Sequence, residues 1–573
     1  MFSLSNIWVY GLLIFPFFFI TGIPFPYIYP KVIFIEVWAA IGLLLFTFKK
    51  EEDKKISLSG IELTFIGLTL FGFLSLLWTE DIIAGLFGPF WRGTGLVFYS
   101  ALILAGMVFK EREFDKELFA KFVLYAGTAV SIILFCTAIF DSVGQMQKNL
   151  MGNPNASSMW VGTTVLLNYL YGEKIFKNDK FKIGFVYLIN IVVVLMLGSR
   201  SAIFGVLLGL LIGSFLGNKK IFKRSVYITL GATGLMLAQY FLMKESVLKN
   251  LIIRSKQFYR IDIWDGALHS FLAKPFLGYG FHGLIQGYWE NYTSSLIVKH
   301  AWNDNAHSLF LNLAAELGLF GILGFIALCY FFGKELLKKE GAAKSGWLGI
   351  LFYIGLYSAF QPFYVDSSLL ILFLVLVMGG EEIVKFSRNN LAWKGTKVIL
   401  SIFLLVIAFY QYSLMTLANK TRHDIVGKGN YRKTWNKFMK TPSFLDKPGV
   451  FLEISNQMRL PFTAAGARFK VLQKPFSSFM VNEYSEVIKE WEHRPRSLEN
   501  YSMWLVRRKK MDDALIYLDK ILKRSDRVTK AYYNKAHVYI MKKDYKTAKE
   551  NLLKVKELNP KFDNIDKILS RFK

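Results

Sequence analysis

The chain has 573 residues, of which 53% are hydrophobic and 16% aromatic, and its formal net charge is +28. Soluble domains are about 45–50% apolar, and here the excess is gathered in runs of about 15–25 apolar residues, which match the thickness of a bilayer core. This composition excludes an ordinary soluble protein and predicts a polytopic membrane protein.

Thirteen membrane-spanning helices are predicted within the first 417 residues. They lie near residues 7–20, 31–48, 59–78, 95–109, 119–140, 157–172, 183–197, 201–216, 225–243, 307–332, 345–361, 367–379 and 396–417. No Lys or Arg precedes the first span, and it lacks a small-residue cleavage site. We therefore expect it to be retained rather than removed as a signal peptide.

Basic residues occupy every second loop between these spans. They cluster near residues 49–55, 110–116, 174–182, 219–224, 334–344 and 385–397, whereas the intervening short loops carry only Arg92, Lys148 and Arg200. Cytoplasmic loops carry the excess of Lys and Arg in membrane proteins. The pattern predicts a cytoplasmic N-terminus and places everything after residue 417 outside.

The C-terminal region, residues 418–573, holds 35 basic and 17 acidic residues. Within it, MDDALIYLDKILKRSD and YKTAKENLLKVKELNP align at an offset of 34 residues, which is the period of tetratricopeptide helix pairs. We expect such repeats over about residues 498–562, forming a surface for a protein partner. The charge indicates an anionic neighbour, and nucleic acid is not expected on that side of a membrane. Both cysteines, Cys136 and Cys329, fall in predicted spans, which excludes an external disulfide framework or thiolate zinc site.

Polar groups at the predicted outer ends of spans are the candidate site, because desolvating them is costly. They are Arg92, Asn153, Asn155, Arg200, Arg260 and the stretch from His300 to His307. Arg200 is either a snorkelling anchor or an anion clamp. Arg260 is either a solvated loop residue or the start of a helix that shares a face with Trp264. The asparagines either cap the next span or bind sugar hydroxyls and phosphate.

His307 is predicted to stand in the first turn of a span, with Asn305 as its cap. The helix dipole and half-dry surroundings would keep its imidazole neutral, so that it could accept a proton from a hydroxyl. Two alternatives are an interfacial anchor and, if the segment were helical, a metal site of His300, Asp304 and His307. Glu316 is expected to pair within the bundle.

Several short motifs occur in order along the chain. They are Arg-x-x-Gly at 92–95, Gly-Asn-Pro-Asn at 152–155, Ser-Arg-Ser at 199–201, Arg-x-x-x-Trp ahead of Pro and Gly-x-Gly at 260–280, and Asn-Ala-His-Ser-Leu-Phe-Leu leading to Glu-Leu-Gly-Leu-Phe-Gly at 305–321. Together they resemble the O-antigen ligase and polymerase family, which includes the bacterial protein O-oligosaccharyltransferases. Ser308 departs from the pattern, since many members have Asn there.

The resemblance implies an all-α, polytopic bundle of glycosyltransferase type C character in the bacterial cytoplasmic membrane. This domain would span residues 1–417, with a large outer loop at 244–306, and an extracytoplasmic helical domain would span 418–573. Membrane lipids, a polyprenyl-diphosphate-linked glycan and a lipid, glycan or protein acceptor would be its partners.

The implied reaction moves a glycan to an acceptor hydroxyl without nucleotide sugar, cofactor or metal. In that family the arginines matching Arg200 and Arg260 bind the diphosphate, and the histidine matching His307 assists the acceptor. The candidate substrate-binding residues are Arg92, Asn153, Asn155, Trp264 and His300.

Three acceptor classes stay open, because ligation to a lipid, polymerisation of a glycan and transfer to a protein differ only in the acceptor pocket. A glycolipid transporter or flippase would need charges through the membrane interior, whereas the central segments here carry almost none besides Glu36, Glu62 and Glu316. A non-enzymatic scaffold would leave the arginines and histidines unexplained.

Overall fold

The computed structural model describes residues 8, 11–20, 27–47, 55–89, 92–110, 116–140, 151, 153–217, 219–242, 259–291, 304–361, 365–387, 391–427, 433, 436–437, 440, 485, 488, 492–560, 562 and 565–572. This part of the chain is almost entirely helical, with one two-stranded sheet. The all-α class is therefore confirmed.

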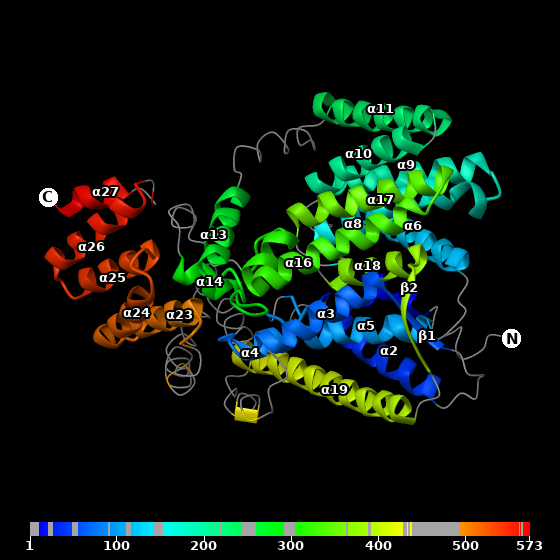
Figure 1. Cartoon of the computed structure of the whole chain (residues 1–573). Coiled ribbons are helices and arrows are strands. Elements are labelled where there is room, and N and C mark those ends of the chain that lie inside the picture. The colour runs from blue at the N-terminus through cyan, green and yellow to red at the C-terminus, as the bar shows by residue number, and fades with distance from the viewer. Residues whose placement is uncertain are drawn as a thin grey trace.

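A bundle of long apolar helices forms the body of the molecule (Figure 1). Its members are α2 (Tyr29–Thr47), α3 (Gly60–Ser75), α5 (Leu96–Lys110), α6 (Lys116–Phe140), α8 (Pro154–Ile175), α9 (Lys180–Leu197), α10 (Arg200–Gly217), α11 (Lys219–Leu242), α16 (Leu309–Leu337), α17 (Gly341–Phe360), α18 (Val365–Met378) and α19 (Leu391–Gly427). Every predicted span after the first coincides with one of these helices. Within the described residues, five segments are long and apolar enough to cross a membrane, namely Tyr29–Thr47, Glu117–Thr137, Lys180–Leu197, Leu309–Leu337 and Ala392–Lys420.

The first predicted span differs from the structure. Over the described residues 11–20 the chain forms a short 3-10 helix, η1 (Leu12–Phe17), rather than an α-helix of membrane length. Pro16 lies inside it and has no N–H for an α-helical hydrogen bond. The apolar composition predicted the location, but the proline changes the conformation.

Helices α10 and α17 pack closely in antiparallel directions. A β-carbon added to Gly209 would lie 2.8 Å from the Gly349 carbonyl oxygen, so the two backbones touch. One turn further on, the Ser345 hydroxyl donates to the Gly213 carbonyl at 2.5 Å. Small residues at this spacing allow apolar helices to approach in a membrane. The start of α10 therefore lies at the same end of the bundle as the end of α17.

Helices α3 and α16 are antiparallel in the same way. The rings of Phe71 and Phe320 stack with centroids 4.2 Å apart, and Gly60 lies against Phe331. The end of α3 is therefore beside the start of α16. We call the end of the bundle where α3 and α17 end and α10 and α16 begin the long-loop end, and the opposite end the basic end.

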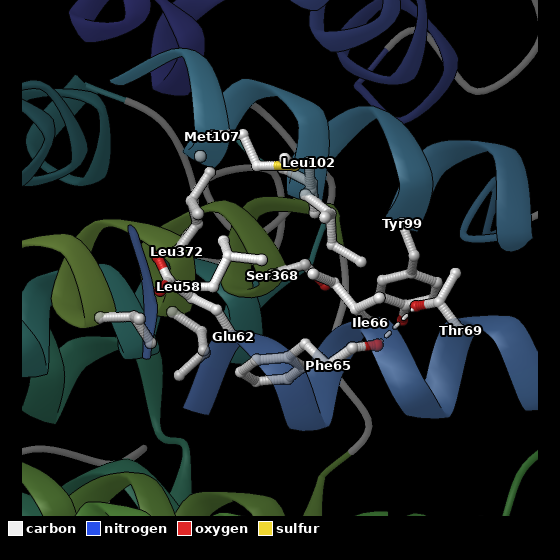
Figure 2. Close-up of a pocket in the computed structure, with 14 residues that line it drawn as sticks. Leu58, Glu62, Phe65, Ile66, Thr69, Tyr99, Leu102, Met107, Ser368 and Leu372 are labelled. Atoms are coloured by element: carbon white, nitrogen blue, oxygen red, sulfur yellow. Dashed lines mark hydrogen bonds between the residues drawn. The ribbon is translucent and has the colours of Figure 1, made fainter. Parts of the chain in front are cut away.

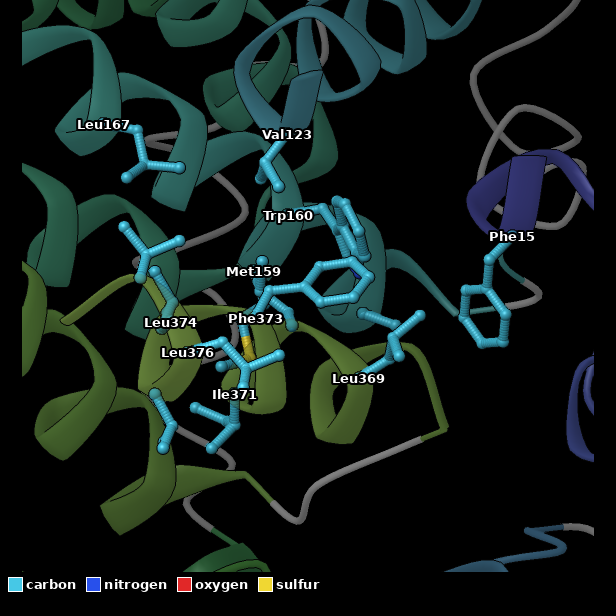
Figure 3. Close-up of a cluster of buried hydrophobic side chains, with 14 of the residues drawn as sticks. Phe15, Val123, Met159, Trp160, Leu167, Leu369, Ile371, Phe373, Leu374 and Leu376 are labelled. Atoms are coloured by element: carbon cyan, nitrogen blue, oxygen red, sulfur yellow. The ribbon is translucent and has the colours of Figure 1, made fainter. Parts of the chain in front are cut away.

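The apolar core is centred on α6, α8 and α18 (Figure 3). The ring of Phe373 meets Trp160 at 6.1 Å and Phe119 at 4.9 Å, both nearly perpendicular. Each of these side chains is at most 2% exposed, and burial of one such side chain contributes about 1.5–3 kcal/mol.

Two buried polar pairs tie α2 to its neighbours. The Lys31 ammonium donates to Asp366 of α18 at 2.5 Å, and Gln411 of α19 donates to Glu36 at 3.2 Å. Removing one partner of a buried pair leaves an uncompensated polar group. These pairs therefore fix how α2, α18 and α19 sit against each other.

A small antiparallel sheet closes the basic end and was not predicted. Strand β1 (Lys55–Ser59) pairs with β2 (Glu382–Ser387), with Ser57 opposite Lys385. The two strands are far apart in sequence, so their pairing depends on the bundle that brings them together.

The C-terminal helices form antiparallel pairs beyond the long-loop end (Figure 1). They are α23 (Pro495–Arg507), α24 (Met511–Arg524), α25 (Thr529–Met541), α26 (Tyr545–Leu558), α27 (Ile565–Leu569) and the 3-10 helix η3 (Ser570–Phe572). The predicted period places Ala514 over Ala548 and Leu518 over Leu552, and all four side chains are at most 1% exposed. The helical repeat is confirmed, whereas α19 runs past the predicted domain boundary at residue 417.

Candidate active site

Three further helices lie at the long-loop end (Figure 1). They are α4 (Ile82–Phe87), α13 (Tyr259–Ala273) and α14 (Leu284–Glu290). The turn between α13 and α14 is inserted into a break in α16. At this break Gly318 has φ 59° and ψ −139°, a conformation that only glycine adopts readily.

Carbonyl groups at the break in α16 accept hydrogen bonds from that turn. The Tyr279 N–H donates to the Ala315 carbonyl at 3.0 Å, and the Gly280 N–H donates to the Glu316 carbonyl at 2.8 Å. Carbonyl groups freed by a helix break must find other donors when buried. The Gly-x-Gly motif and the Glu-Leu-Gly motif are therefore hydrogen-bonded to each other.

His307 lies two residues before α16 and not in its first turn, so the predicted position is wrong. Its backbone is left-handed, with φ 49°, and its N–H donates to the Asn305 side chain at 2.8 Å. Ser308 occupies the N-cap position without a side-chain capping bond. Asn305 therefore closes a local turn instead of capping the helix, as asparagine often does.

Two side chains of α16 hold this turn in place. Asn312 accepts from the Ala306 N–H at 2.6 Å and donates to the Glu316 carboxylate at 3.1 Å. A left-handed backbone at a residue other than glycine costs about 1–3 kcal/mol and persists only where the surroundings enforce it. The pair Asn312 and Glu316 provides that enforcement for His307.

Arg92 also fixes the segment before His307. Its guanidinium grips both carboxylate oxygens of Asp304, with Nη2 donating to Oδ1 at 2.9 Å, and Asn305 donates to the same oxygen at 2.9 Å. Such two-pronged pairs are geometrically specific. Sequence reasoning considered Asp304 only as a metal ligand and missed it as the partner of Arg92.

The alternative of a metal site at this segment gains no support. Asp304 and His307 lie in bends rather than in a helix, and His300 lies outside the described residues. Over the part of the chain that the structure describes, no group of three His, Cys, Asp or Glu side chains is placed to hold a metal ion.

Arg260 stands at the start of α13, and the predicted helix here is confirmed. Its guanidinium carbon lies 5.8 Å from the ring centroid of Phe360 at the end of α17. Trp264, one turn on, contacts the same ring at 5.5 Å. The indole N–H of Trp264 is buried and has no protein hydrogen-bond partner within the described residues. The Phe360 ring thus contacts both Arg260 and Trp264 and orients their side chains.

Burial, together with nearby positive charge, keeps the His307 imidazole neutral. Burial lowers its pKa to about 4, with further lowering by the positive charges of Arg92 and Arg260, against an opposite effect of Asp304. The ring atom Nδ1 is buried and has no protein hydrogen-bond partner among the described residues. A neutral imidazole at pH 7 can accept a proton.

Arg200 is the first residue of α10 and therefore lies at the long-loop end, at the level of Phe360. It is not among the groups that shift the pKa of His307 in the described structure. Asn153 caps α8 by accepting from the Asn155 N–H at 2.8 Å, which confirms the capping interpretation for Asn153. Asn155 lies inside α8 and does not cap it, and a role of either residue in binding stays a prediction. The Asn155 carbonyl accepts from the Tyr357 hydroxyl of α17 at 3.0 Å. The fold thus brings these residues to one end of the bundle.

His282 is a site residue that sequence reasoning missed. It has a left-handed backbone with φ 59°, and its Nε2 lies 2.8 Å from the carbonyl of Thr94, two residues after Arg92. Burial lowers its pKa, so this imidazole is also neutral. The available signal was its position two residues after Gly280.

An apolar cavity lies between α3, α5 and α18 (Figure 2). Thr69 and Tyr99 line its long-loop end, and Leu58 lines it toward the basic end. The Phe281 ring, adjacent to His282, meets Tyr99 edge-on at 6.1 Å. The cavity therefore begins beneath the turn that carries His282.

Residues 185–326 match the family model of the O-antigen ligases. Residues 529–562 match a tetratricopeptide repeat, and none of the curated proteins matches the chain. The resemblance and the C-terminal repeat expected from the sequence are confirmed. The matched region contains Arg200, Arg260 and His307. With the apolar helices, it indicates a multi-pass membrane protein with a glycosyltransferase-like role.

Proposed function

We propose that the chain is a membrane glycosyltransferase that moves a glycan from a polyprenyl-diphosphate carrier to an acceptor hydroxyl outside the cytoplasmic membrane. The observation that carries this proposal is the neutral His307 imidazole, held in a strained turn within the electrostatic reach of Arg92 and Arg260. The family match over this region supports a transferase.

The proposed topology has thirteen spans, with the N-terminus inside and residues after 417 outside. The antiparallel helix pairs support it, because Lys110, Lys334 and Lys385 come together at the basic end while Arg92 and Arg260 lie at the other. Basic loops favour the cytoplasmic side. The long-loop end would then face outward.

In the proposed step, the acceptor oxygen attacks the anomeric carbon of the donor sugar. The bond from that carbon to the diphosphate breaks, and its electron pair leaves with the diphosphate. The hydroxyl proton passes to a ring nitrogen of His307. A base positioned in this way contributes roughly 10²–10⁴-fold to a rate.

Arg200 and Arg260 would bind the diphosphate and stabilise the negative charge that develops on it. Guanidinium groups suit this role because they bind phosphate oxygens in pairs and remain charged. Arginine charge would serve in place of a metal ion. A bound diphosphate would also offset the positive charge near His307 and raise the pKa of that imidazole toward working pH.

The cavity between α3, α5 and α18 would receive part of the isoprenoid chain of the donor. Its wall is almost entirely apolar (Figure 2). Tyr99 at its long-loop end contacts Phe281, the residue before His282. A lipid-bound donor would explain why the candidate catalytic groups lie at the end of a membrane bundle and not in a soluble domain.

The acceptor would be a protein, a growing glycan or a lipid. The repeat region favours a protein or polymer acceptor, because stacked helix pairs form binding surfaces. The second candidate function is a glycolipid transporter. Against it, the charges of Arg92, Asp304 and Arg260 act on one imidazole at the long-loop end rather than following a path through the bundle.

The test uses purified full-length chain in lipid nanodiscs, a polyprenyl-diphosphate-linked oligosaccharide and an envelope extract as the source of acceptor. We expect His307→Ala to lower the release of free polyprenyl diphosphate at least about a hundredfold. The matched control is His269→Ala, because His269 is exposed on α13 and contacts only its own helix in the described structure.

Full activity of His307→Ala, with normal folding and insertion, would refute the proposed base. If the wild-type chain moves the glycolipid across a vesicle membrane without releasing polyprenyl diphosphate, the transporter is correct instead.

A further inference from the structure

The C-terminal repeat helices lie against the loops of the candidate active site (Figure 1). Arg524, the last residue of α24, donates to Glu80 at 2.5 Å and to Glu290 at 2.7 Å. Its guanidinium carbon also lies 4.6 Å from the ring centroid of Trp289. One arginine therefore joins the repeats to the segment before α4 and to the end of α14.

A second ionic contact reaches the start of α4. Arg494, which precedes α23, pairs with Asp81, and His493 lies 3.5 Å from the same carboxylate. Asp81 also caps α4 by accepting from the Ala84 N–H at 3.0 Å. Burial alone raises the pKa of Asp81, but the charge of Arg494 and the contacts with His493 hold it below its ordinary value. The carboxylate thus stays charged while bonded to both domains.

The Asp81–Arg494 pair is largely shielded from water, whereas Arg524 and its partners Glu290 and Glu80 are partly exposed. The side chains of Asp81 and Arg494 are 13% and 10% exposed, and that of Arg524 is 23% exposed. Exposed ion pairs contribute little, whereas breaking a desolvated pair leaves a charge without compensation. The buried contact between Arg494 and Asp81 therefore constrains the loop before α4.

Apolar side chains continue the same contact. Tyr288 and Trp289 of α14 belong to one continuous cluster of buried residues with Leu498, Tyr501 and Trp504 of α23. The repeats thus share a core with the site loops.

Helices α4 and α14 are connected to the groups around His307. Helix α4 leads within five residues to Arg92, which grips Asp304. Helix α14 follows His282 directly, and the Asn291 side chain at its end donates to the Tyr279 hydroxyl at 2.7 Å. A displacement of α4 or α14 would therefore move the charges and the turn that set the His307 geometry.

We infer that Arg494 and Arg524 are positioning residues for glycan transfer, and that the repeat domain clamps α4 and α14 into the arrangement that the active site needs. The inference rests on the proposed function, since transfer is the activity that the clamp supports. It assigns the repeats a role inside the enzyme, in addition to any recruitment of partners.

The experiment measures glycan transfer and hydrogen exchange on the full-length chain in nanodiscs. We expect Arg524→Ala to lower kcat about tenfold, because small displacements of reacting groups are costly, with a smaller change in KM for the polyprenyl-diphosphate-linked oligosaccharide. Amide exchange should accelerate in residues 80–89 and 275–291, and not in α25 and α26.

Three further variants supply a control, a charge reversal and a rescue. Lys554→Ala removes a lysine that pairs with Glu557 of its own helix α26 at 2.7 Å, and it should leave transfer unchanged. Arg524→Glu should be at least as damaging as Arg524→Ala. Adding Glu290→Arg places an arginine between two carboxylates again and should restore part of kcat.

Unchanged kcat in Arg524→Ala and Arg524→Glu would overturn the inference, whether or not exchange accelerates. The inference would also be overturned if Arg524→Ala lowered kcat no more than Lys554→Ala does, or if the swapped pair showed no recovery. An inactive wild-type chain would refute the proposed function itself, and the exchange data would still report whether the repeats hold the loops.

Discussion

The two ends of the helix bundle both carry clustered charge, but they use it differently. At the basic end, cations and carboxylates satisfy one another: Lys338 contacts Glu335 at 3.0 Å and Glu381 at 2.8 Å, and Lys334 contacts Glu381 at 2.9 Å. Hydrogen bonds and charge from these lysines lower the pKa of Glu381 to about 2. All of these groups remain accessible to water, apart from the more buried Glu335.

At the long-loop end, two arginines act on a histidine that is left uncharged. Arg92 and Asp304 are only 12% and 14% exposed, and the strained turn at His307 is maintained by Asn312. Opposite charges that pair at the protein surface hold a helix end in place. We propose that the charges around the neutral, strained imidazole form a site for an anionic ligand and a proton transfer.

Removing one arginine from each end of the bundle is the strongest test of the difference between the two ends. We expect Arg260→Ala to lower transfer by about 10²–10³-fold, because a group that stabilises charge in the transition state is lost. Arg224→Ala removes an exposed arginine that contacts Glu173 at 2.7 Å at the other end, and it should have almost no effect. Equal rates for the two variants, measured as release of polyprenyl diphosphate, would contradict the distinction between the ends.

The acid dependence of transfer should reveal the perturbed imidazole. His307 must be neutral to act as a base, and its pKa in the empty site is about 4. The acid limb of kcat/KM should therefore lie near pH 4, with about a tenfold loss per pH unit below it. Because the diphosphate offsets the arginine charge, the acid limb of kcat should lie at higher pH. An acid limb of kcat/KM near pH 6.5 would show that the surroundings do not shift the pKa of His307.

The turn before α16 can be loosened without removing a charged side chain. Asn312→Ala removes the acceptor of the Ala306 N–H, and an unsatisfied buried donor costs about 1–3 kcal/mol. We expect transfer to fall by about tenfold if the strained His307 backbone relaxes. Asn551→Ala is the matched control, because Asn551 bonds only a carbonyl of its own repeat helix in the described structure. Wild-type transfer by Asn312→Ala would mean that the turn needs no enforcement.

The smallest effect is expected at the basic end. Lys338→Ala breaks exposed contacts with Glu335 and Glu381, and Lys334 remains to pair with Glu381. Transfer by the purified variant should stay within about twofold of wild type, as for most exposed sites. A large loss would show that charge at this end also serves the reaction.

The positions of the helices could be predicted from the sequence, because apolar runs, prolines and caps act over a few neighbouring residues. Asn153 and Pro154 mark the start of α8, and the spacing of Ala514 and Ala548 marks the repeats. Arg260 and Trp264 could be paired for the same reason, since they lie one helical turn apart. The one predicted span that differs, near residues 7–20, contains Pro16.

Only the tertiary structure decided what these residues contact. The partner of Arg92 lies 212 residues away in the sequence, and β1 pairs with β2 although the two strands are far apart in the sequence. Arg524 reaches Glu80 and Glu290 from the repeat helices. The left-handed backbone of His307 likewise depends on Asn312, a residue on the helix that follows it. Such contacts depend on how whole helices pack, and no local pattern of residues encodes that packing.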